Sequence, residues 1–469
     1  KHSQLDWTQI TVFLIVGAFA SLLAFRIFQP YAFSGPGFFG VIPNETWVGN
    51  IMEQRAQASG DADLPFAFQW ARRSKLYSFE NLTKWGLGYP LGILAWAGFL
   101  WMGWRILKGE YRHILLWGWT AFYFLWQSTQ FNPTMRYQLP IYPLLAMMAA
   151  WGVFRLASFN KLRTVSLKVG KFKSKTFQLS NLPTVLAVLI GSGVLIATAL
   201  WAYAFVQIYQ NPHPRVAATR WIFRNVPGPI NLRIKQGAGE FYQQPLTYPM
   251  GTPLQADMPY GNHFVPKVDG LLTEVTFAHV QDLVDSDPRT LNLLISAQPN
   301  LPPEQALASA SLTADFSADE FQTLVLNPPI MLVAGETYFF TLSTDAGSLT
   351  VKGAAPINES SWDDGLPLRM DGYDGFGGIY QNGLNMEMYW EDNAAKLARF
   401  TENLEKGEYL FISSNRQWAT ITRVEERYPL SKAYYEYLIG CPPEKDVIWC
   451  YNVAQPGDFE EQLGYELVE

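Results

Sequence analysis

The residues best suited to chemistry lie in FNPTMRYQLPIYPLL, residues 131–145. Arg136 stands at the predicted outer end of an apolar run, and Tyr137 follows it. A guanidinium at that depth is suited to bind a lipid phosphate through two parallel hydrogen bonds. Pro140 and Pro143 would free backbone groups where a span lines a cavity. The alternative is an arginine that extends to the interface without a ligand.

A second candidate group lies in the segment 29–87. Asp61 and Asp63 precede LPFAFQWARR, which carries Trp70 and two arginines. Paired carboxylates beside these residues are suited to bind a metal or a sugar, or to act as a general base. Asp61 and Asp63 are therefore candidates for a catalytic acid or base. The alternative is a solvated loop.

The stretch 359–392 combines acidic and aromatic residues. Carboxylates accept hydrogen bonds from sugar hydroxyls, and aromatic rings cover the apolar face of a sugar ring. The candidate glycan-binding residues are Trp362, Asp363, Asp364, Asp371, Tyr373, Asp374, Tyr380 and Trp390. Oxygen-rich loops of this kind also hold Ca²⁺ or Mg²⁺, so a divalent cation is a candidate cofactor. The alternative is an ordered loop whose aspartates cap turns.

The two cysteines, Cys441 and Cys450, frame CPPEKDVIWC. Outside the membrane they are suited to form a disulfide, and the alternative is two free or buried thiols. No histidine lies at ligand spacing from them, so no zinc site is predicted. The chain contains no P-loop, dinucleotide-binding glycine turn, G-x-S-x-G elbow or H-E-x-x-H motif.

The charge distribution shows which elements must position these residues. The 469-residue chain has a formal charge of −6, which combines +11 in residues 1–209 with −17 in residues 210–469. Twelve of its 17 tryptophans lie in the first part. This split excludes one uniform soluble domain and a disordered chain. It predicts a membrane part joined to an aqueous part.

Five runs free of charge predict transmembrane helices. Each approaches the ~20 apolar residues that cross a hydrocarbon layer of ~30 Å. Tryptophan and tyrosine gather at their ends, as they do at membrane interfaces. The runs lie within residues 10–25, 88–104, 114–127, 138–154 and 183–209.

The short basic loops predict the orientation. Residues 155–182 carry seven lysines and arginines and no acid, and residues 105–113 are also basic. The positive-inside rule places both loops in the cytoplasm. Lys1 is then inside, and the outer loop 29–87, the turn 130–137 and residues 210–469 are outside. The expected location is a plasma membrane that the chain crosses several times, with membrane lipids as partners. A nucleic-acid partner is not expected, because the basic run lies between two spans.

The outer half is expected to contain two folds. Residues 264–355 are short β-type runs separated by turns, which predict a β-sandwich of jelly-roll kind. This sandwich and the acidic loop, residues 264–392, would be an insertion. The host would be a small α/β domain formed from 210–263 and 393–469, with helices at 393–406 and in SKAYYEYLIG and strands in YLFISS and VIWCYNVA. The predicted fold class is a five-span α-helical membrane protein with this extracytoplasmic module.

Several segments also carry the features of an enzyme family. They are RIFQPYAFSGPGFFG, NLTKWGLGYPLGILAWAGFLWMGWRI, MRYQLPIYPLLAMMAAWG, HPRVAATRWIFRNVP, SSWDDGLPLRMDGYDGFGG, MYWEDN, LFISSNRQWATITRVEERYPLSKAYYEYL and CPPEKDVIWCYNVAQPG. With them the chain resembles bacterial polytopic glycosyltransferases of the protein mannosyltransferase and aminoarabinose transferase group. Those enzymes have the C-type membrane fold and about twice as many spans. The five spans here resemble the C-terminal ones, so Lys1 is expected to follow an upstream half.

The resemblance implies an inverting transfer of a sugar from a polyprenyl-phosphate donor to a glycan or protein acceptor on the outer face. In that group a cation binds the lipid phosphate, and Arg136 with Tyr137 matches its Arg-Tyr-x-x-Pro pattern. The group's catalytic acid lies in the first outer loop, where this chain has Asp61 and Asp63 without the group's motif. The acid is alternatively upstream of Lys1 or on another membrane chain. A second class of function is a non-catalytic membrane-anchored subunit of an envelope or membrane complex that binds glycan or a partner.

Overall fold

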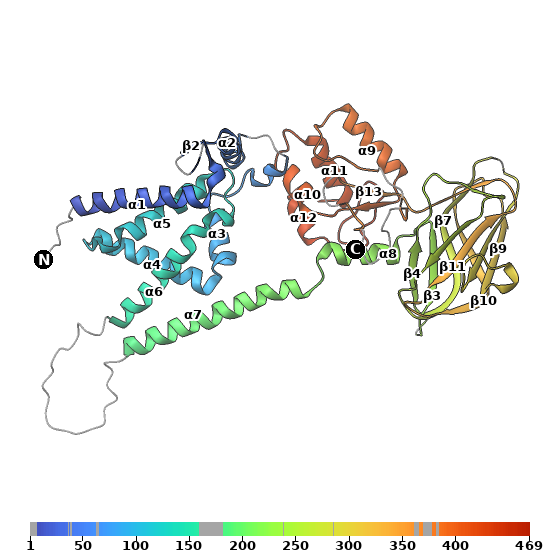
Figure 1. The fold of residues 1–469 in the computed structure, drawn as a ribbon, viewed down its shortest axis with the longest axis horizontal. Helices are drawn as coiled ribbons and strands as arrows, with labels where there is room; N and C mark the ends of the chain where they lie inside the picture. The colour runs from blue at the N-terminus through green and yellow to red at the C-terminus, as the bar shows by residue number, and fades with distance from the viewer. Residues whose placement is uncertain are drawn as a thin grey trace, which may run out of the picture. The chain divides into compact units, whose positions relative to one another are not determined.

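The chain divides into two compact units, Lys1–Val206 and Gln207–Glu469, each with its own core (Figure 1). In the computed structural model, the residues described are 7–35, 37, 40–61, 65–158, 182–237, 239–284, 286–360, 365–368, 378–380 and 384–469.

The first unit is helical. Four helical segments of the described chain are long and apolar enough to cross a membrane, and the last of them continues into the second unit: Thr8–Phe28, Tyr89–Leu107, Met135–Ala157 and Pro183–Asn225. They contain α1 (Trp7–Phe28), α4 (Tyr89–Leu107), α6 (Tyr142–Ser158) and α7 (Leu182–Gln207). The fifth predicted span forms α5 (Ile114–Thr129). Its 16 residues reach only about 24 Å, so four of the five expected helices have spanning length.

Helices α4 and α6 form the core of this unit. Leu82, Ala95, Ile141 and Leu145 are buried together between them and the neighbouring turns. Gly98 of α4 lies directly against the backbone of Met148 in α6, where any side chain would collide. The helices therefore approach more closely than larger residues allow, as is common between transmembrane helices.

Shorter elements occupy the segment between α1 and α4. They are the turn η1 (Pro30–Ala32), the paired strands β1 (Phe33–Ser34) and β2 (Ile42–Pro43), α2 (Glu45–Ser59), η2 (Pro65–Trp70), α3 (Tyr77–Asn81) and the π-helical turn η3 (Leu82–Gly86). Asn44 caps α2, because its side chain accepts a hydrogen bond from Thr46 N at 2.9 Å. A second short turn, η4 (Tyr111–His113), joins α4 to α5.

The second unit contains a ten-stranded antiparallel sheet that curls on itself. Its strand order is β4-β3-β7-β10-β9-β8-β11-β6, with β12 paired to β5 and β7. The strands are β3 (Ile230–Lys235), β4 (Phe241–Leu246), β5 (Leu254–Gln255), β6 (Tyr260–Phe264), β7 (Gly270–Asp282), β8 (Arg289–Ser296), β9 (Ala308–Ala314), β10 (Glu320–Leu332), β11 (Tyr338–Thr344) and β12 (Ser348–Lys352). Helices long and apolar enough for a membrane part, and a β domain, are both present as expected.

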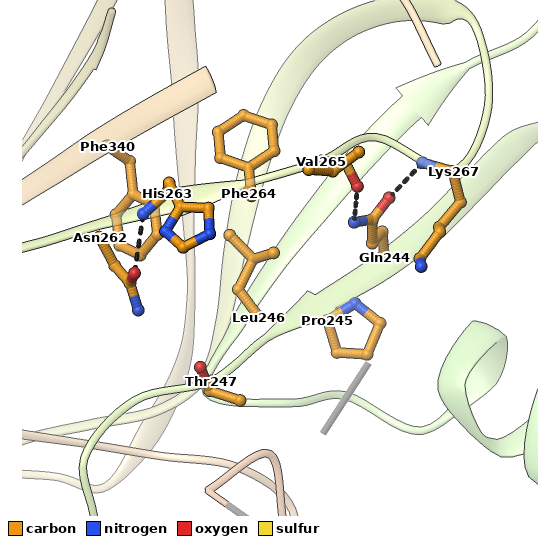
Figure 2. Close-up of a pocket in the computed structure, with 10 residues that line it drawn as sticks. All are labelled: Gln244, Pro245, Leu246, Thr247, Asn262, His263, Phe264, Val265, Lys267 and Phe340. Atoms are coloured by element: carbon orange, nitrogen blue, oxygen red, sulfur yellow. Dashed lines mark hydrogen bonds between the residues drawn. The ribbon is translucent and has the colours of Figure 1, made fainter. Parts of the chain in front are cut away.

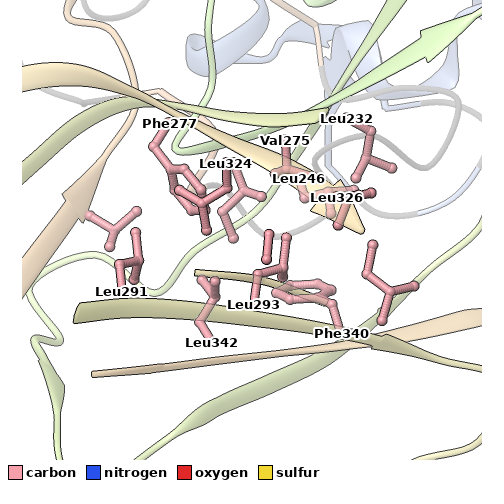
Figure 3. Packing of buried hydrophobic residues seen from close by; sticks show 14 of the residues in the cluster. Leu232, Leu246, Val275, Phe277, Leu291, Leu293, Leu324, Leu326, Phe340 and Leu342 are labelled. Atoms are coloured by element: carbon pink, nitrogen blue, oxygen red, sulfur yellow. The ribbon is translucent and has the colours of Figure 1, made fainter. Parts of the chain in front are cut away.

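One apolar core fills the space inside the curled sheet. Figure 3 shows Phe277, Val275 and Leu324 from one layer facing Leu293 and Leu342 from the other. Along β8 and β10 the buried side chains alternate with more exposed ones, as in a two-layer β structure.

The sheet begins earlier in the chain than expected. Strands β3 to β6 lie within residues 230–264, which the sequence assigned to the small α/β domain. Leu232 and Ile234 of β3 are buried in the sheet's core, and Asn231–Lys235 pair with β7. Because these apolar residues find their partners in the sheet, the 264 boundary is replaced by one near Ile230.

The remaining part of this unit is mostly helical. It contains α8 (Pro214–Asn225), α9 (Ala394–Lys406), α10 (Asn415–Ile421), α11 (Pro429–Ile439), α12 (Val447–Val453) and the parallel pair β13 (Pro356–Asn358) and β14 (Tyr409–Phe411), with the turns η8 (Ile208–Gln210) and η9 (Pro303–Gln305) elsewhere. The strand expected in VIWCYNVA is wrong. Asp446 accepts a hydrogen bond from Ile448 N at 2.7 Å and starts a helix, whose residues Val447 and Cys450 face inward.

A disulfide joins Cys441, just after α11, to Cys450 in α12. Their Cα atoms are 5.9 Å apart, within the ordinary range for such a bond. Of the two alternatives for these cysteines, the structure contains the disulfide.

A buried ammonium holds the helical part together. Lys396 Nζ donates to the carbonyl oxygens of Met388 and Trp390 and to Asp392 Oδ1, each at 2.8 Å, and lies 2.6 Å from Ser431 Oγ. Asp392 also accepts from Ser431 N at 2.9 Å. Burial lowers the pKa of Lys396, and the Asp392 carboxylate opposes that change. The network thus ties the segment 388–392 to α9 and α11.

We predict that Asp392→Asn destabilises this unit by about 3–5 kcal/mol, because it leaves a buried ammonium without its carboxylate. The double variant with Lys396→Met should lose less than the sum of the two single losses, since both belong to one network. Urea unfolding of the detergent-solubilised chain measures these free energies. Lys406→Met is the matched control, because its pair with Glu402 is exposed and contributes at most about 0.5 kcal/mol. Equal losses at positions 392 and 406 would contradict the prediction.

Candidate functional site

Arg136 lies in the 3-10 turn η5 (Met135–Ile141), which leads directly into α6. Its side chain is exposed, and its guanidinium lies 5.6 Å from the centre of the Tyr137 ring. Within the described part of the chain, no carboxylate lies at ion-pair distance from Arg136. An exposed arginine without a carboxylate partner keeps its hydrogen-bond donors available for an anion.

The turn that carries Arg136 is fixed by hydrogen bonds from three sides. Tyr123 in α5 donates to Tyr137 O at 3.0 Å, and Ser78 in α3 donates to Pro133 O at 3.1 Å. Asn132 N donates to Ala58 O in α2 at 3.2 Å. The turn 130–137 and the segment 29–87, both expected on the outer side, therefore meet at one end of the helical bundle.

Gln138, two residues after Arg136 in the same turn, is completely buried. Its Nε2 donates to Ser128 Oγ at 3.3 Å, while its Oε1 and the Oδ1 of Asn132 have no partner among the described residues. Buried polar atoms without partners are uncommon and often mark places where water or a ligand binds. They add two acceptors to this end of the bundle.

Asp61 lies at this same end. It follows Gly60, whose positive φ of +87° ends α2 and whose Cα packs against the Phe131 ring. Asp61 Oδ2 accepts a hydrogen bond from Ser59 Oγ at 2.6 Å, and the residue is exposed. Asp61 and Arg136 are thus on segments that touch, but no direct interaction joins the two side chains in the described structure. Asp63 lies outside the described residues.

Most of the candidate glycan-binding stretch also lies outside the described residues: Trp362, Asp363, Asp364, Asp371, Tyr373 and Asp374. Trp390 is described and half-exposed, and the Arg399 guanidinium covers one face of its ring at 4.5 Å. Tyr380 is buried and donates to Val226 O at 3.1 Å, so it has a packing role. Across the described ranges, no three His, Cys, Asp or Glu residues are placed to hold a metal ion.

A small pocket opens in the curled sheet between β4 and β6 (Figure 2). Its volume is about 150 Å³. Five of its ten lining residues are polar: Gln244, Thr247, Asn262, His263 and Lys267. Tyr260 lies nearby, and burial raises its pKa although hydrogen bonds with Asn262 and Thr247 lower it. Burial and Tyr260 raise the pKa of Tyr248 to about 12, so both phenols stay neutral.

A cluster of titratable groups joins the sheet to the helical part. His279 Nε2 in β7 lies 3.0 Å from both carboxylate oxygens of Glu408, and Nδ1 lies 3.1 Å from Asp319 Oδ1. Lys352 Nζ is 3.7 Å from Asp319 Oδ2. The hydrogen bond with Glu408 raises the pKa of His279 against the effect of burial. Although burial opposes it, the hydrogen bonds from His279 and Ala355 N lower the pKa of Glu408.

Three features of the second unit are missing from the sequence-based predictions: the His279–Glu408 contact, the β4–β6 pocket and the buried Lys396. His279 and Glu408 are 129 residues apart, so no local pattern links them. The β4–β6 pocket depends on the strand order. Lys396 did leave a signal, because Phe400 and Asn403 follow it at helical spacing and all three are buried. A lysine on that apolar face, four residues after Asp392, indicates a buried pair.

We predict that the His279–Glu408 pair stabilises the second unit most between about pH 4.5 and 6.5. Its contribution should fall as pH rises through the raised pKa of His279, because the imidazolium is lost. It should also fall as pH drops through the lowered pKa of Glu408, because the carboxylate is lost. The melting temperature of the chain minus that of His279→Gln, measured from pH 3 to 9, checks this. A constant difference would contradict the prediction.

Comparison with known proteins does not assign this geometry to a family. No family model, curated protein or solved structure matches the chain. The candidate sites consequently depend on the residues and contacts described above.

Proposed function

We propose that the chain is a membrane glycosyltransferase, or the C-terminal part of one. In this proposal it binds a polyprenyl-phosphate sugar at the end of the bundle that carries Arg136. The observation behind the proposal is an exposed guanidinium, without a carboxylate partner among the described residues, on a turn that leads into a helix of membrane-spanning length. A lipid phosphate lies at this level of a bilayer, and a guanidinium binds it with two parallel hydrogen bonds.

The reaction assigns a task to each group. The acceptor hydroxyl attacks the anomeric carbon, the bond from that carbon to the phosphate oxygen breaks, and the lipid phosphate leaves. Arg136 stabilises the charge that develops on the leaving phosphate. A carboxylate takes the acceptor's proton, and Asp61 is the described candidate because its segment packs against the Arg136 turn.

The proposed orientation puts this end of the bundle and residues 207–469 outside the cytoplasm of a bacterial cell. Two observations support it. The short basic loop that holds Arg105, Lys108 and Arg112 is at the other end of the bundle, and the sequence that follows Arg155 is also basic. The Cys441–Cys450 disulfide is the kind of bond that persists in an oxidising compartment.

A second candidate function is a non-catalytic, membrane-anchored subunit that binds a glycan or a partner. The pocket between β4 and β6 favours this reading, because it lies in the aqueous unit and is lined by polar side chains. The two functions differ in whether Arg136 is needed and whether sugar is transferred.

We predict that Arg136→Ala lowers the affinity for undecaprenyl phosphate by about 10- to 100-fold, as expected for the loss of charged hydrogen bonds. Arg136→Lys should retain part of the affinity but lose the bidentate geometry. Native mass spectrometry of the detergent-solubilised chain measures lipid binding, and transfer from polyprenyl-phosphate sugars measures activity. Arg112→Ala is the matched control, because Arg112 lies just before the start of α5, whereas Arg136 follows the end of that helix. Unchanged binding in Arg136→Ala excludes the assigned role.

We also predict on which side of the membrane two segments lie, α2 and the loop after α4. Glu53→Cys in α2 should react in intact cells with a membrane-impermeant maleimide, whereas Lys108→Cys should react only after lysis. Both positions are exposed, and the native cysteines are paired with each other. The reverse labelling pattern would overturn the proposed orientation.

A further inference from the structure

The curled sheet has one open side. The strand order begins at β4 and ends at β6, and within the described residues no ladder of backbone hydrogen bonds joins these two strands. The pocket lies in this gap, between Gln244–Thr247 on one side and Asn262–Val265 on the other. Two edge strands therefore meet at a cavity instead of pairing.

A peptide strand is a poor fit for the gap. Gln244 already crosses it: its Nε2 donates to Val265 O and its Oε1 accepts from Lys267 N, both at 2.9 Å (Figure 2). This side-chain amide occupies the backbone groups that an added strand would use. Pro245 follows in β4 and has no N–H to donate. The gap therefore cannot accept an added strand at the end where Gln244 crosses it, and the rest of the gap forms the pocket.

The pocket in this gap has an apolar base and polar side chains around it. Leu246, Phe264 and Phe340 are buried and form the apolar part of the lining. The His263 imidazole forms no hydrogen bond with other described residues, and the Thr247 hydroxyl lies within hydrogen-bond reach of Tyr260. Asn262 is oriented by its neighbours, since its Nδ2 donates to Tyr260 Oη at 3.0 Å and its Oδ1 accepts from His263 N at 2.8 Å. Figure 2 shows Asn262 and His263 at the end of the pocket opposite the Gln244 contacts.

We infer that this pocket binds a single sugar ring, such as the terminal residue of a glycan. An apolar base suits the C–H face of a pyranose, and hydroxyl, imidazole and amide groups suit its hydroxyls. The volume of about 150 Å³ is below the roughly 300–1,000 Å³ of sites for larger organic ligands. None of the lining residues is Asp or Glu, which argues against a cation. The site does not depend on the proposed transferase activity.

Saturation-transfer NMR with the full chain in detergent tests this inference. The probes are the methyl glycosides of glucose, galactose, mannose and N-acetylglucosamine, with methyl glucuronide as the anionic arm and glycerol as the non-ring polyol. We expect at least one glycoside to bind and glycerol to give no signal. Thr247→Val and His263→Ala should each weaken that binding about fivefold, as for the loss of one hydrogen bond.

Thr247→Val conserves side-chain volume and leaves the Thr247 carbonyl that accepts from Tyr260. Thr323→Val is the matched control, because Thr323 is exposed on β10, away from the lining residues. It should leave binding unchanged, and circular dichroism of each variant should match the parent. Absence of binding by every glycoside, equal binding in Thr247→Val, or displacement of the glycoside by an extended peptide would each overturn the inference. Lipid binding by Arg136 is measured separately, so failure here does not count against the transferase.

Discussion

The rest of the structure depends on the exposed apolar surface of the helices of membrane-spanning length. The described protein covers only a small part of that surface. In the most apolar window of α1 none of the residues is buried, and in that of the α7 segment only 6% are. Water would make such exposure very costly, whereas lipid chains cover it without cost. A bilayer around these helices then confines the polar turns to its two surfaces. That confinement explains why Arg136, Asp61 and the buried amide of Gln138 gather at one end.

The second unit covers its apolar residues with other parts of the same unit instead of lipid. Its sheet buries apolar residues between two layers, and its helical part buries them beneath α8, α9 and α11. Among the polar groups that enter these cores, Lys396 and Asp392 form the most extensive hydrogen-bond network. The His279–Glu408 contact joins the sheet to the helical part through charge, and therefore responds to pH where the apolar packing does not.

Local pattern was enough to predict the elements whose formation depends on local forces. Long apolar runs predicted the helices of the first unit, and alternation predicted the strands of the second. α5 fell short because its polar flanks, from Tyr111 to His113 and from Gln130 onward, leave the helix at 16 residues. VIWCYNVA was wrong because its β-branched and aromatic residues suggested a strand, while the Asp446 cap and the inward spacing of Val447 and Cys450 produced a helix.

Long-range partners could not be predicted from the sequence. No residue near Ile230 or Leu232 indicates that their strand pairs with β7, about 45 residues later. The predicted start of the sheet, at residue 264, was therefore too close to the C-terminus. The same limit applies to the candidate sites. The type of Arg136 and its place after an apolar run were readable, but its contact with the α2 segment and the pocket between β4 and β6 arise only when distant segments meet.

The way the gap between β4 and β6 is filled has a consequence for association between copies. Open strand edges are the usual starting points for aggregation. Gln244 occupies the backbone groups at one edge and Pro245 removes a donor from it, so a neighbour's strand finds little to pair with. The sheet can therefore keep a hollow side open without offering a template for amyloid-like growth.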